Sequence, residues 1–112
     1  MANLNYNNEQ TKDRTIFQEW KDNGKDGWNK AFERVFHLFY HRAFVTCRLH
    51  CYDDATAEQL AVEAIYNAFL EIDGMMKSCQ IEWRGEQAFS SFIWRRVSFR
   101  CLDEIRKLLR EQ

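Results

Sequence analysis

Apolar residues return at three- and four-residue intervals along three long stretches of this chain, as they do on one face of an α-helix. The pattern predicts helices over about residues 26–51, 56–72 and 89–110. The inward face of the last helix would carry Phe89, Phe92, Ile93, Val97, Cys101, Ile105 and Leu108. The chain has no proline and only 4 glycines, so few breaks are signalled within these stretches.

The first part of the chain predicts one short helix and one long helix. Residues 9–22 carry a small apolar stripe, and Gly24 beyond them suits a left-handed helix end. Asp26 is a reasonable N-cap for the long helix, which would continue to about Cys51. The predicted inner stripe of this helix is Trp28, Phe32, Val35, Phe36, Phe39, Ala43 and Cys47.

The next helix is predicted to begin with a capping box, in which Thr56 caps the backbone and Gln59 reaches back to it. It would end near Ile72, and its inner face would carry Leu60, Ala61, Ala64, Ile65, Ala68, Phe69 and Ile72. Its outer face would show Glu58, Gln59, Val62, Glu63, Tyr66 and Asn67. Residues 73–87 have no clear period, so we expect a loop that packs back on the bundle.

These elements predict an all-α fold, a compact bundle of three long helices plus a short N-terminal helix. Residues 1–25 would form a polar tail and the short helix, and residues 26–112 a single helical domain. No apolar run approaches the roughly 20 residues that span a bilayer, and the polar start is unlike a signal peptide. The 4 cysteines are therefore expected to be free thiols of a cytoplasmic protein without a membrane partner.

Charge is distributed unevenly, although the net charge is only −1. Residues 53–76 hold six acids and no Lys or Arg, whereas residues 84–112 hold seven bases against four acids. The outer face of the last helix combines cations with an aromatic residue: Trp94, Arg95, Ser98, Arg106, Lys107 and Arg110. Flat rings beside arginines suit the stacking of unpaired bases, although arginines on a helix exterior are often simply solvated. The separation of an acidic segment from a basic one suggests two surfaces for two partners.

Catalytic and metal chemistry have little support in the sequence. There is no Gly-rich phosphate loop and no nucleophile elbow, so we expect no enzyme, no catalytic residue and no cofactor. His37 and His41 are one helical turn apart, as are Cys47 and Cys51, but the two pairs lie roughly 15 Å apart along one helix. The cysteines are better explained as buried apolar residues. A sensor that binds a metal through the Cys and His residues of this helix remains a further hypothesis.

Three stretches, in this order and spacing, resemble the region-two domain of bacterial RNA polymerase sigma factors of the extracytoplasmic-function type. The first contains Lys30-Ala31-Phe32, then Phe39 and His41-Arg42. The second is AEQLAVEAI at residues 57–65, followed by Phe69. The third contains WRGE at 83–86, FSSFI at 89–93 and LDEIRK at 102–107. The resemblance covers roughly residues 30–110.

The resemblance implies a transcription initiation factor with two partners, the RNA polymerase core and promoter DNA; an anti-sigma factor would be a third. The clamp helices of the polymerase beta-prime subunit would bind Glu58, Gln59, Val62, Glu63, Tyr66 and Asn67. The melted minus-ten promoter element would bind Arg84, Trp94, Arg95, Phe99, Arg100, Arg106, Lys107 and Arg110. The acidic segment would thus serve the protein partner and the basic segment the DNA.

The chain departs from the family pattern at several positions. Gln59 replaces an acid and Val62 a glutamine on the polymerase side, while Phe99 replaces an asparagine on the DNA side. Arg96 replaces an apolar residue and is expected to reach solvent or an acid. The family's helix-turn-helix domain for the upstream promoter element has no counterpart within these residues. A sigma-like helical adaptor that binds protein and no DNA is therefore the alternative.

Overall fold

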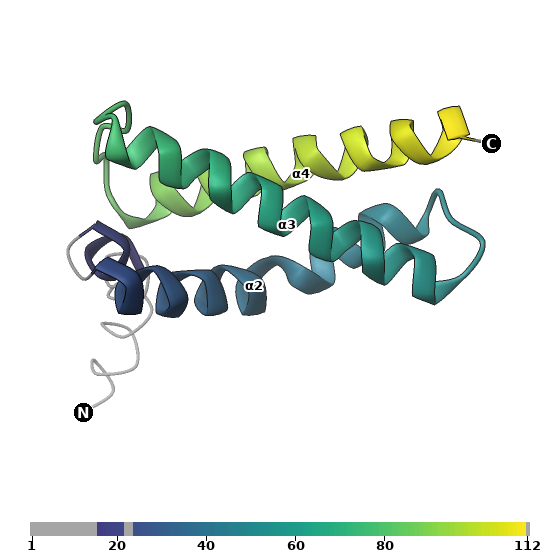
Figure 1. Cartoon of the computed structure of the whole chain (residues 1–112), viewed down its shortest axis with the longest axis horizontal. Coiled ribbons are helices and arrows are strands. Elements are labelled where there is room, and N and C mark those ends of the chain that lie inside the picture. The colour runs from purple at the N-terminus through teal and green to yellow at the C-terminus, as the bar shows by residue number, and fades with distance from the viewer. Residues whose placement is uncertain (1–15, 22–23, 112) are drawn as a thin grey trace.

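The computed structural model of the protein describes residues 16–21 and 24–111, which form helices joined by short connections. The three long helices are α2 (Gly24–Arg48), α3 (Asp54–Lys77) and α4 (Glu86–Glu111). Short connections reverse the chain between them, so that each helix runs antiparallel to the next (Figure 1). The predicted all-α bundle is confirmed. Within the described residues, no helix is both long and apolar enough to cross a bilayer.

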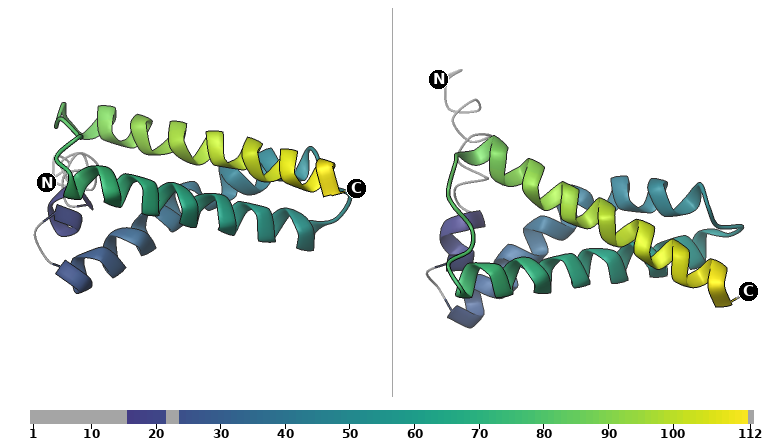
Figure 2. Two further views of the ribbon diagram at one scale, coloured as in Figure 1. Left: turned by 45° about the horizontal axis from the view of Figure 1, so that its top comes forward. Right: turned by 90° about the horizontal axis from the view of Figure 1, so that it is seen from above.

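The core lies where α2 and α4 both pack on α3 and also touch each other (Figure 2). The buried residues of α2 recur every four residues: Gly27, Ala31, Val35, Phe39, Ala43 and Cys47. Four-residue ridges of this kind interdigitate when helices cross at an angle, and small side chains let the backbones approach closely. The predicted inner faces of α3 and α4 are buried, except that Phe92 and Leu108 are only partly covered.

The start of α3 differs from the prediction of a capping box at Thr56. The helix begins at Asp54, and its N-cap is Asp53, whose extended backbone has φ −135° and ψ 161°. The Asp53 carboxylate accepts a hydrogen bond from the Thr56 backbone N–H at 3.0 Å. Thr56 therefore lies in the first turn, because an Asp three residues earlier already satisfies the free N–H there.

The end of α3 was also predicted wrongly, since the helix continues through Gly74 to Lys77 rather than stopping near Ile72. It is closed by two backbone hydrogen bonds, from Cys79 to Met76 at 3.2 Å and from Gln80 to Met75 at 2.8 Å. This is the Schellman arrangement, with Cys79 at a positive φ of 58° where glycine is usual. The connection to α4 is thereby shortened to residues 78–85.

A short helix over residues 16–21 closes one end of the bundle. The Trp20 ring stacks on Phe69 of α3, with centroids 4.0 Å apart and planes inclined by 11°. Its Nε1–H donates to the buried carboxylate of Asp73 at 3.0 Å, and Lys77 pairs with the same carboxylate at 3.0 Å. The described part of the predicted N-terminal helix is thus confirmed, while residues 9–15 and 22 of that prediction lie outside the described residues.

Candidate nucleic-acid interface

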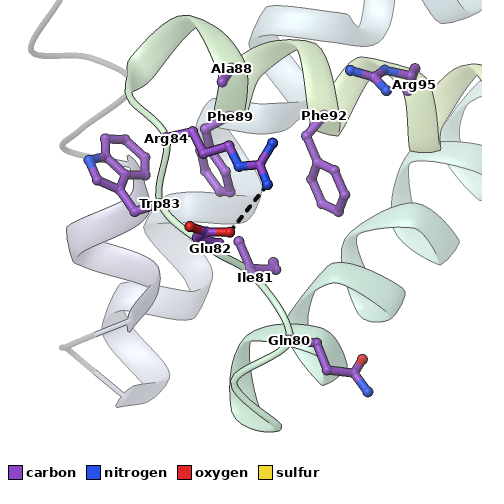
Figure 3. Close-up of a pocket in the computed structure, with 9 residues that line it drawn as sticks. All are labelled: Gln80, Ile81, Glu82, Trp83, Arg84, Ala88, Phe89, Phe92 and Arg95. Atoms are coloured by element: carbon purple, nitrogen blue, oxygen red, sulfur yellow. Dashed lines mark hydrogen bonds and ion pairs between the residues drawn. The ribbon is translucent and has the colours of Figure 1, made fainter.

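An open hollow of about 360 Å³ is lined by the connection between α3 and α4 and by the first turns of α4. Its lining residues are Gln80, Ile81, Glu82, Trp83, Arg84, Ala88, Phe89, Phe92 and Arg95. Arg84 and Arg95 supply two cations from different elements, and Phe92 offers a partly exposed ring between them (Figure 3). The combination of a flat apolar wall and guanidinium groups suits a nucleobase attached to a phosphate.

Aromatic packing holds the connection in place behind this hollow. The Trp83 ring lies 4.6 Å from Phe17 of the short helix and 5.8 Å from Phe89, centroid to centroid. Trp83 is one of the residues that line the hollow, but its ring extends toward residues 16–21 (Figure 3). Arg84 is exposed and forms an ion pair with Glu82 at 3.2 Å, a contact that contributes little to stability in water. The backbone is fixed while the Arg84 side chain stays accessible.

The predicted DNA-binding residues of α4 lie on three sides of the helix: the outward face, the flank toward α2 and the flank toward α3. Arg95, Phe99 and Lys107 follow one another at multiples of four residues on the outward ridge, where Phe99 is 55% exposed. Arg106 and Arg110 are exposed toward the end of the helix. Arg106 lies 3.7 Å from Asp103, and Lys107 lies 3.3 Å from Glu104, so each cation pairs with an acid three residues earlier on the helix.

Trp94 does not point outward, contrary to the expectation from sequence. Its ring is partly buried and stacks on Phe39 of α2, with centroids 5.8 Å apart and planes inclined by 26°. The Arg42 guanidinium covers the same ring at 4.1 Å. The residue lies on the flank of α4 that faces α2, because α2 packs against that flank as well as against α3.

Arg100 lies on the opposite flank of α4 and is bound to α3. Its Nε and Nη2 donate to one carboxylate oxygen of Glu71 at 3.1 and 2.7 Å, while Arg96 Nη1 donates to the other at 2.7 Å. Arg96 therefore pairs with an acid, which is one of the two outcomes expected for its position. It also lies over the Phe92 ring at 5.4 Å. The charge of Arg100 is largely neutralised by this contact, so it is not a free cation of the basic face.

The predicted polymerase-binding residues on α3 are also divided by the packing. Val62 and Tyr66 are 41% and 43% exposed, and Tyr66 meets Phe32 of α2 edge-on at 6.0 Å. Glu58, Gln59 and Glu63 are exposed as well. Asn67, by contrast, is partly buried and donates its side-chain N–H to Glu104 of α4 at 3.4 Å. Asn67 is therefore engaged within the molecule.

Two residues of the candidate site, Phe92 and Arg42, were not predicted from the sequence to belong to it. Phe92 was assigned to the core, since it lies three residues after Phe89, yet it lines the hollow. Arg42 was noted only within a family motif, yet it covers Trp94. The signal for Phe92 was its position at the edge of the apolar stripe, where a helical residue is only half covered. For Arg42, its contact with another helix leaves no local signal.

The cysteines of the bundle behave as core residues. Cys47, Cys51 and Cys101 are buried, as predicted for the first two, and Cys79 is exposed. The pKa of Cys101 is raised, first by its hydrogen bond with Cys47 and then by burial, so the thiol stays protonated. Across residues 16–21 and 24–111, no group of three or more His, Cys, Asp or Glu side chains is arranged to hold a metal ion.

Comparison with known proteins gives no further guide to this arrangement. The chain matches no protein-family model, no curated protein and no solved structure.

Proposed function

We propose that this chain is a sigma-like transcription initiation domain that binds single-stranded promoter DNA and the RNA polymerase core. The observation that carries the DNA part is the hollow beside α4, where Arg84, Arg95 and the Phe92 ring converge. A single base would enter the hollow and stack, while the two guanidinium groups would bind the flanking phosphates. Stacking on an aromatic side chain is worth about 1–3 kcal/mol per base, enough to favour an open strand locally.

The outward ridge of α4 would continue this contact along the strand. Arg95, Phe99 and Lys107 are spaced about one helical turn or two apart, and none of them is needed for the core. Arg106 and Arg110 would add phosphate contacts further along. Trp94 and Arg100 would contribute less directly, since each is already packed against a neighbouring helix.

Direct binding tests the DNA part of the proposal. The full chain is titrated into a labelled single-stranded oligonucleotide of mixed sequence and into the same sequence as a duplex. We expect the single strand to bind more tightly, and Arg84→Gln and Arg95→Gln each to weaken binding. Both variants remove exposed side chains, so their circular dichroism should match that of the parent. Unchanged affinity in both variants would show that the DNA face lies elsewhere.

The polymerase part rests on the exposed apolar residues of α3. Val62 and Tyr66, together with Leu70 at 41% exposure, form an apolar strip on a helix whose other exposed residues include Glu58 and Glu63. A strip of this kind is typical of a protein-binding surface. Co-precipitation with the polymerase core should be lost in Val62→Arg combined with Glu63→Arg. Core binding that survives this double change would argue against α3 as the docking helix.

The same apolar strip favours one alternative function, a helical adaptor that binds a protein and no DNA. The adaptor predicts that Val62→Arg abolishes partner binding while Arg84→Gln and Arg95→Gln have no effect on any ligand. The two functions are therefore distinguished by the nucleic-acid titration alone.

A further inference from the structure

Few arginines in the described part of the chain are without an ion pair. Among the residues that the structure describes, the guanidinium groups of Arg42, Arg95 and Arg110 contact no carboxylate, whereas those of the other arginines do. An exposed arginine that faces no acid keeps its full charge for an external anion. Arg42 is the only one of the three that lies on α2, outside the basic segment.

Arg42 is held in place by two aromatic rings. Its guanidinium carbon lies 4.1 Å from the centroid of Trp94 and 5.9 Å from that of Phe39. A guanidinium that stacks on a ring uses its flat face, so its N–H groups remain free at the edge. The aromatic contact therefore fixes the position of the cation without consuming its hydrogen-bond donors. Such a fixed, unpaired cation loses less conformational entropy when it binds a phosphate.

We propose that Arg42 and Trp94 form a second nucleic-acid subsite, which extends the DNA surface across α4 onto α2. This inference rests on the proposed function. Trp94 and Arg95 are adjacent in sequence and about 100° apart around the helix, so Arg95 lies on the outward ridge and Trp94 on the side of it that faces α2. A strand that leaves the hollow at Arg95 and crosses α4 arrives at Arg42. Arg42 binds its phosphate, and the exposed part of Trp94 contacts the adjoining sugar or base.

The chemistry favours a nucleic-acid strand over an acidic peptide. Phosphates recur at regular spacing along a strand and alternate with flat bases, which matches guanidinium groups alternating with rings. Arg95, Trp94 with Arg42, and Phe99 supply this alternation within about one and a half turns of α4, together with the neighbouring α2. A carboxylate-bearing peptide would use the cations but not the rings.

The test compares Arg42→Gln with a matched removal of charge, Lys30→Gln. Lys30 is also exposed on α2 and forms no ion pair within the described residues, but it lies three turns earlier, roughly 18 Å away. That distance exceeds the screening length of about 10 Å at 0.1 M salt. Binding of a labelled 12-nucleotide single strand, a length of about one site for such proteins, is measured by fluorescence anisotropy over a range of salt concentrations.

Arg42→Gln is expected to weaken binding by roughly tenfold, the effect of one charge-assisted hydrogen bond. It should also reduce the slope of log K against log salt by about 0.7, the value for one lost phosphate contact on a single strand. Lys30→Gln should change neither quantity appreciably, and Arg42→Lys, which keeps the charge, should restore the slope. A general loss of fold would not produce this pattern.

Three results would overturn the inference. The first is an equal loss in Arg42→Gln and Lys30→Gln; the second is an Arg42→Lys slope as low as that of Arg42→Gln. The third is that polyglutamate competes as well as DNA and loses the same affinity in Arg42→Gln, which would assign the site to an acidic peptide. Arg84→Gln separates this outcome from failure of the proposed function. If Arg84→Gln weakens DNA binding and Arg42→Gln does not, only the extension onto α2 fails.

Discussion

Neutralising Glu71 should move stability and nucleic-acid binding in opposite directions. Glu71 of α3 is the common acceptor for Arg96 and Arg100 of α4, with N–O distances from 2.7 to 3.1 Å. Its replacement by Gln removes the negative charge but keeps the size and one carbonyl acceptor. The variant loses part of the contact between α3 and α4. The charges of the two arginines are then no longer balanced by Glu71 and can attract an external anion.

The stability change follows from the geometry of the contact. Hydrogen bonds to charged groups contribute about 1.5–3 kcal/mol each, whereas exposed ion pairs contribute about 0–1 kcal/mol. The side chains here are 26%, 38% and 33% exposed, which places the network between these limits. We therefore expect Glu71→Gln to lower the free energy of unfolding by about 1.5 kcal/mol. For a domain near this size, the melting temperature should fall by about 8 °C.

The binding change has the opposite sign and is measured on the same protein. With Glu71 neutral, the affinity for a single-stranded oligonucleotide should rise several-fold, and the slope of log K against log salt should steepen by about 0.7 for each arginine that reaches a phosphate. Anisotropy titrations give the affinity, and thermal circular dichroism gives the stability. The titrations are made well below the melting temperature, so that the variant is folded.

The control for Glu71→Gln is Glu63→Gln, which removes the same charge from the same helix. Glu63 is exposed and forms no ion pair within the described residues. Glu63→Gln should therefore change the free energy of unfolding by less than about 0.5 kcal/mol. If the two variants show the same melting temperature, the contact with the arginines does not stabilise the bundle. If Glu71→Gln binds DNA more weakly than the parent, the arginines it releases do not face the strand.

Three further changes test the packing that supports the site. Trp20→Phe removes the N–H that donates to Asp73 at 3.0 Å, so thermal unfolding should show a loss of about 1.5–3 kcal/mol, and an unchanged melt would contradict the contact. Hydrogen bonds from the Thr56 hydroxyl and then its backbone N–H lower the pKa of Asp53, so this carboxylate stabilises the fold above its ordinary pKa and ceases to do so as pH falls through the lowered value. Melts across the acidic range should therefore flatten in Asp53→Asn, which keeps the cap, whereas Asp53→Ala should be less stable at neutral pH. Cys79→Gly should raise stability by about 0.5 kcal/mol in denaturant unfolding, because glycine adopts the φ of 58° without strain; a loss of stability would refute that assignment.

Much of the fold could be predicted because its helices bury their apolar residues at a regular spacing. Every residue predicted to face inward on α3 is buried, from Leu60 to Ile72. The helix ends were less predictable. The cap of α3 was predicted at Thr56, whereas Asp53 caps the helix because it lies where the chain leaves the extended connection. The end of α3 carried no glycine signal, since Cys79 occupies the left-handed position.

The site could be predicted only in part, because periodicity identifies the face of a helix that is buried but not the helices that cover its flanks. On α4, the ridge of Arg95 and Phe99 lies opposite the core and is exposed as expected. Trp94 and Arg100 lie on either side of that ridge, and their surroundings depend on what α2 and α3 present there. An acid on α3 turned Arg100 into a structural contact, whereas α2 presented a ring and a second cation to Trp94. The basic surface inferred from α4 alone therefore loses Arg100 on the side of α3 and gains Arg42 on the side of α2.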